Sequence, residues 1–237
     1  MSDFAKELKE GTKKSHSAAE NTKFVASFLR GVLDPEEYRK LLGNFYFVYS
    51  AMEEEIKVFA GLYHKAINQI SFPKELNRTA ALEQDLRYYY GPMWRSLIVQ
   101  SEACKTYVDR IKSLGTEEPT LLLAHHYTRY IGDLSGGQIL KGIAKSSLNP
   151  KEGEGLHFYD FPNIKDAKEF KNLYRSRINS INFKESQKTA LIAEANYAFK
   201  LNMDLFNELQ GSASKGLFKV IVGAVKSKLF GKLILDY

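Results

Sequence analysis

The chain has 237 residues, of which 44% are hydrophobic and 26% are charged, and its formal net charge is +6. This composition is typical of a globular protein of one or two domains with a sizeable core. The lone cysteine, Cys104, excludes an intrachain disulfide, and we expect it to be a small buried hydrophobic residue. No zinc-finger spacing, aromatic RNA-binding motif or long basic arm is present, so we expect no nucleic acid partner. Unless it serves solubility alone, the positive charge favours an acidic protein, an anionic ligand or an anionic membrane surface.

Helical periodicity recurs along the chain, with capping and breaking residues at the ends of the periodic runs. Asp34 can cap a helix that has Pro35 at its first position, and Asn149 before Pro150 can end a longer one. No stretch shows the sustained alternation and hairpin turns of β-strands. We therefore predict an all-α fold with one domain over residues 1–211. Its helices should cover residues 8–22, 34–59, 79–90, 94–114, 119–148, 165–180 and 184–210, the last closing at Gly211.

The two ends of the chain show no pattern of a targeting or spanning segment. Residues 1–10 are polar and mixed in charge, so we expect the protein to remain where it is made. Residues 212–237 form a basic apolar tail, whose apolar run is interrupted by Lys219, Lys226, Lys228 and Lys232. We predict that this tail does not span a membrane. A basic interfacial helix, a helix packed on the domain and a frayed end all remain open.

The segment 125–142 reads as helix, yet it contains Gly132, Gly136, Gly137 and Gly142. A glycine inside a helix costs about 1 kcal/mol relative to alanine. Gly132 and Gly136 are four residues apart and share a helical face, which either packs on another helix or accepts a flat partner close to the backbone. Polar side chains beside this face favour a binding site: Tyr127, Arg129 and Asp133.

His16 is the candidate metal ligand because of its neighbours along a helix. At helical spacing it shares a stripe with Lys9, Thr12, Lys13 and Glu20. Glu20 could orient the imidazole or accept its second N–H, and the lysines could hold an anionic ligand. The alternative is a solvated charged face with His16 at its edge.

Lys171 and Arg175, four residues apart, form a second cationic pair. Non-covalent haem needs one axial ligand, a flat apolar slot and cations for its two propionates. The sequence offers a histidine for the first, a glycine-lined helix for the second and scattered cations for the third. No His-Glu-x-x-His, phosphate-loop or Gly-x-Ser-x-Gly motif is present. The remaining acidic cluster should face solvent: Glu53, Glu54 and Glu55.

Over residues 5–210 the chain resembles the haem oxygenase family. The matching segments are Leu8–His16, Ala19–Asn21, Tyr127–Gln138, Phe170–Arg177 and Glu194–Asn196 with Ala198, Phe199 and Asn202. Tyr46–Glu55 and Glu83–Leu86 match as well, and Tyr127–Gln138 is the most diagnostic segment. The sequence is most similar to cyanobacterial, cyanophage or red-lineage plastid members. This resemblance implies a location in the cytoplasm, or in the plastid stroma if the protein is plastid-encoded.

The resemblance implies an all-α, single-domain fold with haem held between a proximal and a distal helix. It implies His16 as the iron ligand with Glu20 as its partner, and Phe199 as part of the pocket wall. Catalytic roles on the distal side fall to Gly132, Gly136, Asp133, Arg129 and Tyr49, with Asn202 in the same network. The propionate side is matched by Lys9, Lys13, Tyr127, Lys171 and Arg175. His126, where family members often carry a different residue beside the matched His125, is a second candidate ligand, although adjacent helical residues point about 100° apart.

The activity implied is the oxidative opening of haem b at its α-meso carbon to biliverdin IXα, carbon monoxide and ferrous iron, with haem as both substrate and cofactor and oxygen as co-substrate. Electrons must come from another protein, since no flavin or nicotinamide fingerprint is present. The net charge and the resemblance favour an acidic ferredoxin as donor, and a bilin reductase would follow downstream. The rival hypotheses are a haem carrier or sensor, and a membrane-surface protein acting through the tail.

Overall fold

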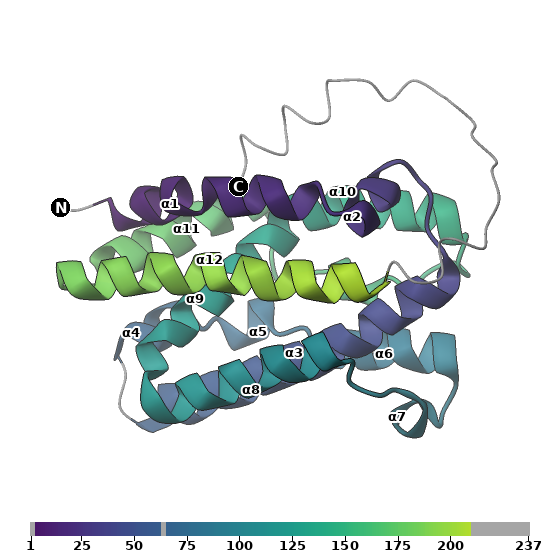
Figure 1. Cartoon of the computed structure of the whole chain (residues 1–237), viewed down its shortest axis with the longest axis horizontal. Coiled ribbons are helices and arrows are strands. Elements are labelled where there is room, and N and C mark those ends of the chain that lie inside the picture. Colours follow the sequence, from purple (N-terminus) through teal and green to yellow (C-terminus); the bar gives the residue numbers. More distant parts are fainter. Residues whose placement is uncertain (1–2, 63–64, 210–237) are drawn as a thin grey trace.

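In the computed structural model, residues 3–62 and 65–209 are described, and within these ranges the fold is all-α with no strand, which confirms the predicted fold class (Figure 1). In chain order its elements are α1 (Phe4–Glu20), α2 (Lys23–Leu29), α3 (Pro35–Leu62), α4 (Lys65–Ile70), α5 (Pro73–Leu76), α6 (Thr79–Tyr90), α7 (Trp94–Leu97), α8 (Glu102–Glu117), the 3-10 turn η1 (Pro119–Leu121), α9 (Leu122–His126), the π-helical turn η2 (Tyr127–Ile131), α10 (Gly132–Leu148), the 3-10 turn η3 (His157–Tyr159), α11 (Ala167–Ser180) and α12 (Glu185–Glu208).

Several helices begin where a side-chain oxygen satisfies the free amides of the first turn. The Asp3 carboxylate accepts from the amide of Lys6, and the Asp166 carboxylate accepts from two amides of α11. At the start of α3, Asp34 Oδ1 accepts from the Glu36 amide at 2.7 Å, and Pro35 is the first helical residue. This confirms the predicted cap.

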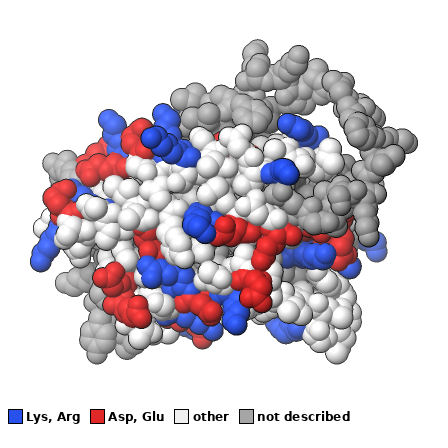
Figure 2. All heavy atoms as spheres, in the orientation of Figure 1, with Lys and Arg blue, Asp and Glu red and all other residues white. Residues whose placement is uncertain are grey.

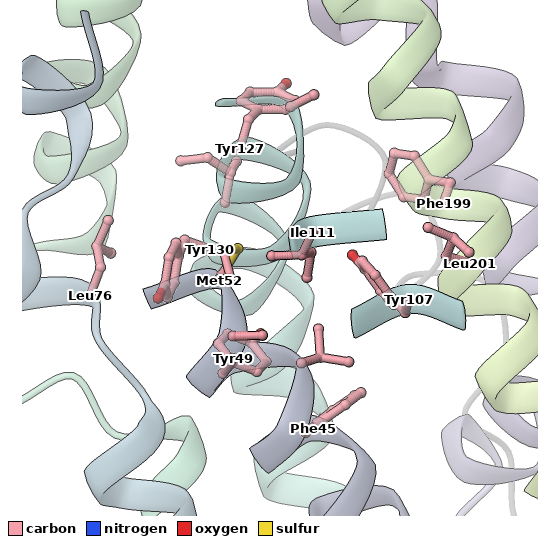
Figure 3. Packing of buried hydrophobic residues seen from close by; sticks show 14 of the residues in the cluster. Phe45, Tyr49, Met52, Leu76, Tyr107, Ile111, Tyr127, Tyr130, Phe199 and Leu201 are labelled. Carbon is pink, nitrogen blue, oxygen red and sulfur yellow. The ribbon is translucent and has the colours of Figure 1, made fainter. Parts of the chain in front are cut away.

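The helices pack as two long pairs joined by the α9–α10 segment. Figure 1 shows α1 and α12 along one side of the molecule and α3 and α8 along the other. α9 contacts both α12 and α3, so it lies between the pairs. The core here is rich in tyrosine, and Figure 3 shows Tyr49 of α3, Tyr130 of η2 and Tyr107 of α8, all fully buried. Their hydroxyls need hydrogen-bond partners inside the protein, which makes this core a polar network as well as an apolar one.

Two predicted helices differ from a continuous α-helix in the structure. The run over 94–114 breaks after Leu97, because Ser101 accepts from the Cys104 amide and starts a new helix. The run over 119–148 is helical throughout, but residues 127–131 form a π-helical turn. All five residues of that turn are buried. Five consecutive buried side chains do not fit one face of an α-helix, so periodicity alone could not predict the turn.

Other expectations have mixed outcomes. Cys104 is buried, as predicted. The expectation that the whole acidic cluster faces solvent is wrong for Glu53, which accepts from the amide of Arg78 at 2.5 Å and from the Tyr130 hydroxyl at 3.0 Å. Burial raises the pKa of Glu53. These partners lie far away in sequence, so helical spacing could not reveal them.

No helix in the described ranges is long and apolar enough to cross a bilayer. Gly211 and the predicted tail over 212–237 lie outside the described residues, so the proposed boundary at residue 211 stays a prediction.

Candidate active site

A cavity lies between α1 and α2 on one wall and η2 and α10 on the other, with parts of α3, η3 and α12 closing it. Its lining is mostly apolar and aromatic, including Phe24, Phe28, Phe45, Leu140, Phe158, Phe199 and Phe206. A slot of this kind accepts a flat apolar ligand with few polar contacts. Its two long walls bring together the histidine of α1 and the glycines of α10.

His16 is placed on the first wall with its side chain only 14% exposed. Its ring meets Phe199 edge-to-face, with the centroids 5.8 Å apart. Burial, reinforced by the nearby Lys9 cation, lowers the pKa of His16 to about 4. The imidazole is therefore neutral at physiological pH, the state in which it binds a metal.

Glu20 lies one helical turn beyond His16, with Oε2 3.8 Å from His16 Nδ1. Burial raises the pKa of this carboxyl, and its Oε1 atom is buried without a hydrogen-bond partner among the described residues. A buried unpaired oxygen is unfavourable, so a polar group of a ligand at this wall would relieve a cost of about 1–3 kcal/mol. The proximal wall therefore fits a metal-bearing ligand.

The opposite wall is bare because Gly132, Gly136 and Gly137 line it. A Cβ added at Gly137 would stand 3.7 Å from the side chains of Asp133 and Tyr159. Three glycines in the first two turns of α10 let a ligand approach the helix backbone, so the smooth face inferred from the sequence lies at the cavity.

Asp133 is the acidic residue among those that line this wall, and neighbouring side chains hold its carboxylate in place. Its carboxylate accepts a hydrogen bond from the Tyr49 hydroxyl, which in turn accepts from Arg129 Nε at 2.9 Å. Burial raises the pKa of Asp133, although Arg129 and Tyr49 oppose this rise. The carboxyl thus faces the cavity in a fixed orientation.

Arg129 is a buried cation stabilised by aromatic faces and hydrogen bonds. Its guanidinium lies 4.3 Å from the Phe45 ring centroid and 4.8 Å from that of Tyr49. Its Nη1 also donates to Asn202 Oδ1. Burial alone would lower the pKa of Arg129, but Tyr49 and Asp133 outweigh burial and raise it. Arg129 therefore keeps its proton and fixes the positions of its neighbours.

The same network continues from Asn202 to the protein surface, partly through residues to which the sequence analysis assigned no role: Tyr107, Glu194 and Arg110. Asn202 Nδ2 donates to the Tyr107 hydroxyl at 3.3 Å, and that hydroxyl lies 3.4 Å from His125 Nδ1. His125 Nε2 lies 2.9 Å from Glu194 Oε1, and Glu194 pairs with Arg110 at 2.7 Å. Glu194 and Asn202 are eight residues apart on α12, two turns along one face, which is the one sequence signal that could have linked them.

Glu194 is strongly held in its ionised form. Burial by itself would raise its pKa, but hydrogen bonds from His125 and Arg110 lower the pKa to about 2. The Arg110 side chain is 32% exposed, so this ion pair marks the outer end of the network.

Neither His126, the second candidate ligand, nor its neighbour His125 lines the cavity. His125 is engaged as described, and His126 places Nδ1 2.7 Å from the Tyr174 hydroxyl and Nε2 3.2 Å from the Ser71 carbonyl. The His126 ring also stacks on Tyr174 at an interplanar angle of 6°. Both ring nitrogens of His126 are occupied by protein groups, so its position corrects the suggestion of a second ligand.

The predicted propionate-side residues do not line the cavity itself. Lys171 Nζ donates to Ser135 Oγ at 3.0 Å, Arg175 donates to Asn172 Oδ1 at 3.3 Å, and Tyr127 is buried. The predicted stripe on α1 also needs correction. Thr12 is buried and donates to the Leu8 carbonyl at 2.8 Å, so it belongs to the core, while Lys13 is exposed.

Comparisons with known proteins agree with this architecture. The "Heme oxygenase" family model matches residues 2–208. The chain is 51% identical to the heme oxygenase of Porphyra purpurea over 226 residues, which cover 95% of this chain and 94% of that one. It is 51% identical to heme oxygenase 1 of Synechocystis sp. PCC 6803 over 215 residues, which cover 91% and 88% of the two chains.

Solved structures give the same result. The crystal structure of heme oxygenase-1 from Synechocystis sp. PCC 6803 in complex with heme has a TM-score of 0.86 at 50% identity, covering 90% of this chain and 95% of that one. The structure of heme oxygenase from Leptospira interrogans has a TM-score of 0.83 at 41% identity, covering 87% and 100%. This chain belongs to the haem oxygenase family.

Proposed function

We propose that this protein is a haem oxygenase, which opens haem at the α-meso carbon to biliverdin IXα, carbon monoxide and ferrous iron. The observation that carries the proposal is a single cavity with neutral His16 on one wall and Asp133 on the glycine-lined wall opposite. When bound, haem supplies both the redox-active iron and the carbon that is oxidised.

The residues present suit this ligand. His16 offers a neutral imidazole nitrogen to the iron, and Glu20 lies one turn away on the same wall to orient the ring. Phe199 supports the imidazole edge-to-face. For the propionate side we rely on the resemblance, because none of the matching residues on α1, η2 and α11 lines the cavity itself: Lys9, Lys13, Tyr127, Lys171 and Arg175.

On the distal side the chain supplies space and an oriented acid. Gly132 and Gly136 leave room beside the helix backbone, and Asp133 can hold water and protons there. Arg129 and the Asn202 amide do not exchange protons readily, so we assign the network behind Asp133 to orientation rather than to long-range proton relay.

Electrons would come from an acidic ferredoxin, and a bilin reductase would consume the product. The support for the first partner is the net charge of +6. On the face seen in Figure 2, Lys and Arg alternate with Asp and Glu instead of forming one continuous basic patch. The proposal therefore rests on overall charge and not on a basic patch in that view.

The decisive experiment adds haem, oxygen and ascorbate to the purified protein. The Soret band should bleach as biliverdin absorption grows, whereas a stable haem spectrum would indicate a carrier. In His16→Ala we expect haem uptake to persist and turnover to fall at least about 100-fold, because the axial nitrogen is lost. Full activity in this variant would exclude His16 as the ligand.

A further inference from the structure

The loop that closes one end of the cavity is held by a buried carboxylate on a different helix. Asp85 of α6 is 0% exposed. Its Oδ1 accepts from the backbone amide of His157 at 2.8 Å and lies 2.8 Å from His157 Nδ1. Its Oδ2 accepts from the backbone amide of Phe158 at 2.8 Å. A fully buried carboxylate is tolerated only when its oxygens are satisfied, so these contacts lock η3 onto α6.

The turn η3, which Asp85 holds, places two aromatic side chains in the cavity wall. Phe158 and Tyr159 both line it. The Phe158 ring lies 5.3 Å from that of Phe45 and 5.4 Å from that of Tyr49, measured between centroids. Tyr49 is the residue that holds Asp133. A path of direct contacts therefore runs from Asp85 through Phe158 and Tyr49 to the distal acid.

The neighbouring anchors fix the far side of the same loop. Gln138 of α10 donates to the Tyr159 carbonyl at 2.8 Å, and Arg78 donates to the Asp160 carbonyl. These bonds reach only the residues after Phe158. Asp85 is the group that holds the amides at His157 and Phe158, where the chain enters the cavity wall.

We propose that Asp85 is a positioning residue, which seats Phe158 against Tyr49 and so fixes both the end wall of the cavity and the orientation of Asp133. This inference rests on the proposed function, because the consequence that we expect from the positioning is attack on the ligand at one meso position only. The role does not require Asp85 to touch the ligand.

Asp85→Asn tests the clamp in the ligand-free protein, because an amide NH₂ must then face one of the backbone N–H groups. Hydrogen exchange at the His157 and Phe158 amides should become at least about tenfold faster. His157→Gln is the matched control, since it removes the ring contact and keeps both backbone donors, and its Phe158 amide should exchange within about twofold of wild type. Unchanged exchange in Asp85→Asn would overturn the clamp.

The second readout is the mixture of bilin isomers formed on turnover. Asp85→Asn should give a mixture where wild type and His157→Gln give one isomer, which a loss of general stability would not produce. If Asp85→Asn fails to fold, Phe158→Leu carries the test, because it keeps the clamp and removes the ring against Tyr49. A single isomer from Phe158→Leu, or from a folded Asp85→Asn, overturns the positioning role. If the wild-type protein binds haem and forms no bilin, the proposed function is wrong. The hydrogen-exchange result still tests whether Asp85 clamps the loop, because it is measured without the ligand.

Discussion

His16 combines two properties that an exposed histidine lacks: it is largely buried, and a lysine on the same helix opposes its protonation. Both favour the neutral ring. A proton and the iron would compete for the imidazole, so the pKa of His16 sets the pH at which binding begins to fail.

Haem affinity should therefore resist acidification further than an ordinary histidine site would. The pKa of His16 is about 4 in the folded protein, below its usual 6.5, so protonation weakens binding only as the pH falls toward 4. We expect the Kd from Soret titration to stay constant between about pH 8 and 5, and to rise about tenfold per pH unit below about 4. Weakening centred near pH 6.5 would contradict the burial argument, and far-UV circular dichroism at each pH controls for unfolding.

Asp133 should act on turnover and not on haem uptake, because it lies on the wall opposite His16. In Asp133→Ala we expect the Kd for haem to stay within about twofold of wild type and the bilin yield to fall at least about tenfold. Asp133→Asn keeps the shape and removes the acid, so it separates the two contributions. Normal yield from the alanine variant would show that Asp133 holds no water or proton that matters.

At the scale of elements, the glycines of α10 fall into two groups, those that line the cavity and one that does not. Gly132, Gly136 and Gly137 line the cavity, whereas a Cβ at Gly142, further along the helix, would meet no atom within 4 Å. Gly142 therefore destabilises the helix relative to alanine and does not contribute to the cavity wall.

This contrast gives a matched pair of variants. Gly136→Leu should fill the slot and raise the Kd for haem at least about tenfold, because the close-packed residues of the cavity walls cannot move apart to make room for both the leucine and the haem. Gly142→Ala should leave the Kd unchanged and raise the free energy of unfolding by about 0.5–1 kcal/mol. Equal haem affinity in Gly136→Leu and wild type, measured by Soret titration, would show that the glycine face is not the haem wall.

Element boundaries show how far local patterns reach. The helix over 79–90 was predicted to its ends, because apolar spacing and the Gly91-Pro92 breaker are local signals. The short helices α2, α4 and α5 were not predicted. Helices of 7, 6 and 4 residues depend on tertiary packing more than on propensity, so local pattern carries little information about them.

At the scale of the whole molecule, net charge governs encounters with a partner. Screening shortens the range of electrostatic attraction from about 30 Å at 0.01 M salt to about 3 Å at 1 M. With an acidic ferredoxin as donor, the reduction rate should fall at least about tenfold over this range. Ascorbate-driven turnover, which needs no docking, should change little and serves as the control. A ferredoxin rate that is independent of salt would exclude electrostatic docking.

The sequence by itself determined the helical class, the Asp34 cap and the face shared by Gly132 and Gly136, because each depends on spacing within a few turns of one helix. The tertiary structure brought to one cavity His16 and Asp133, which the resemblance had assigned to opposite sides of the haem. Only the tertiary structure decided that Glu194 holds His125 and that Asp85 holds the loop at Phe158. These pairs are 69 to 117 residues apart and lie on different elements, as the positions 16 and 133, 125 and 194, and 85 and 158 show. Contacts between residues so far apart in sequence depend on how the helices pack. Helical periodicity indicates which face of a helix is apolar, but not which other helix packs against that face.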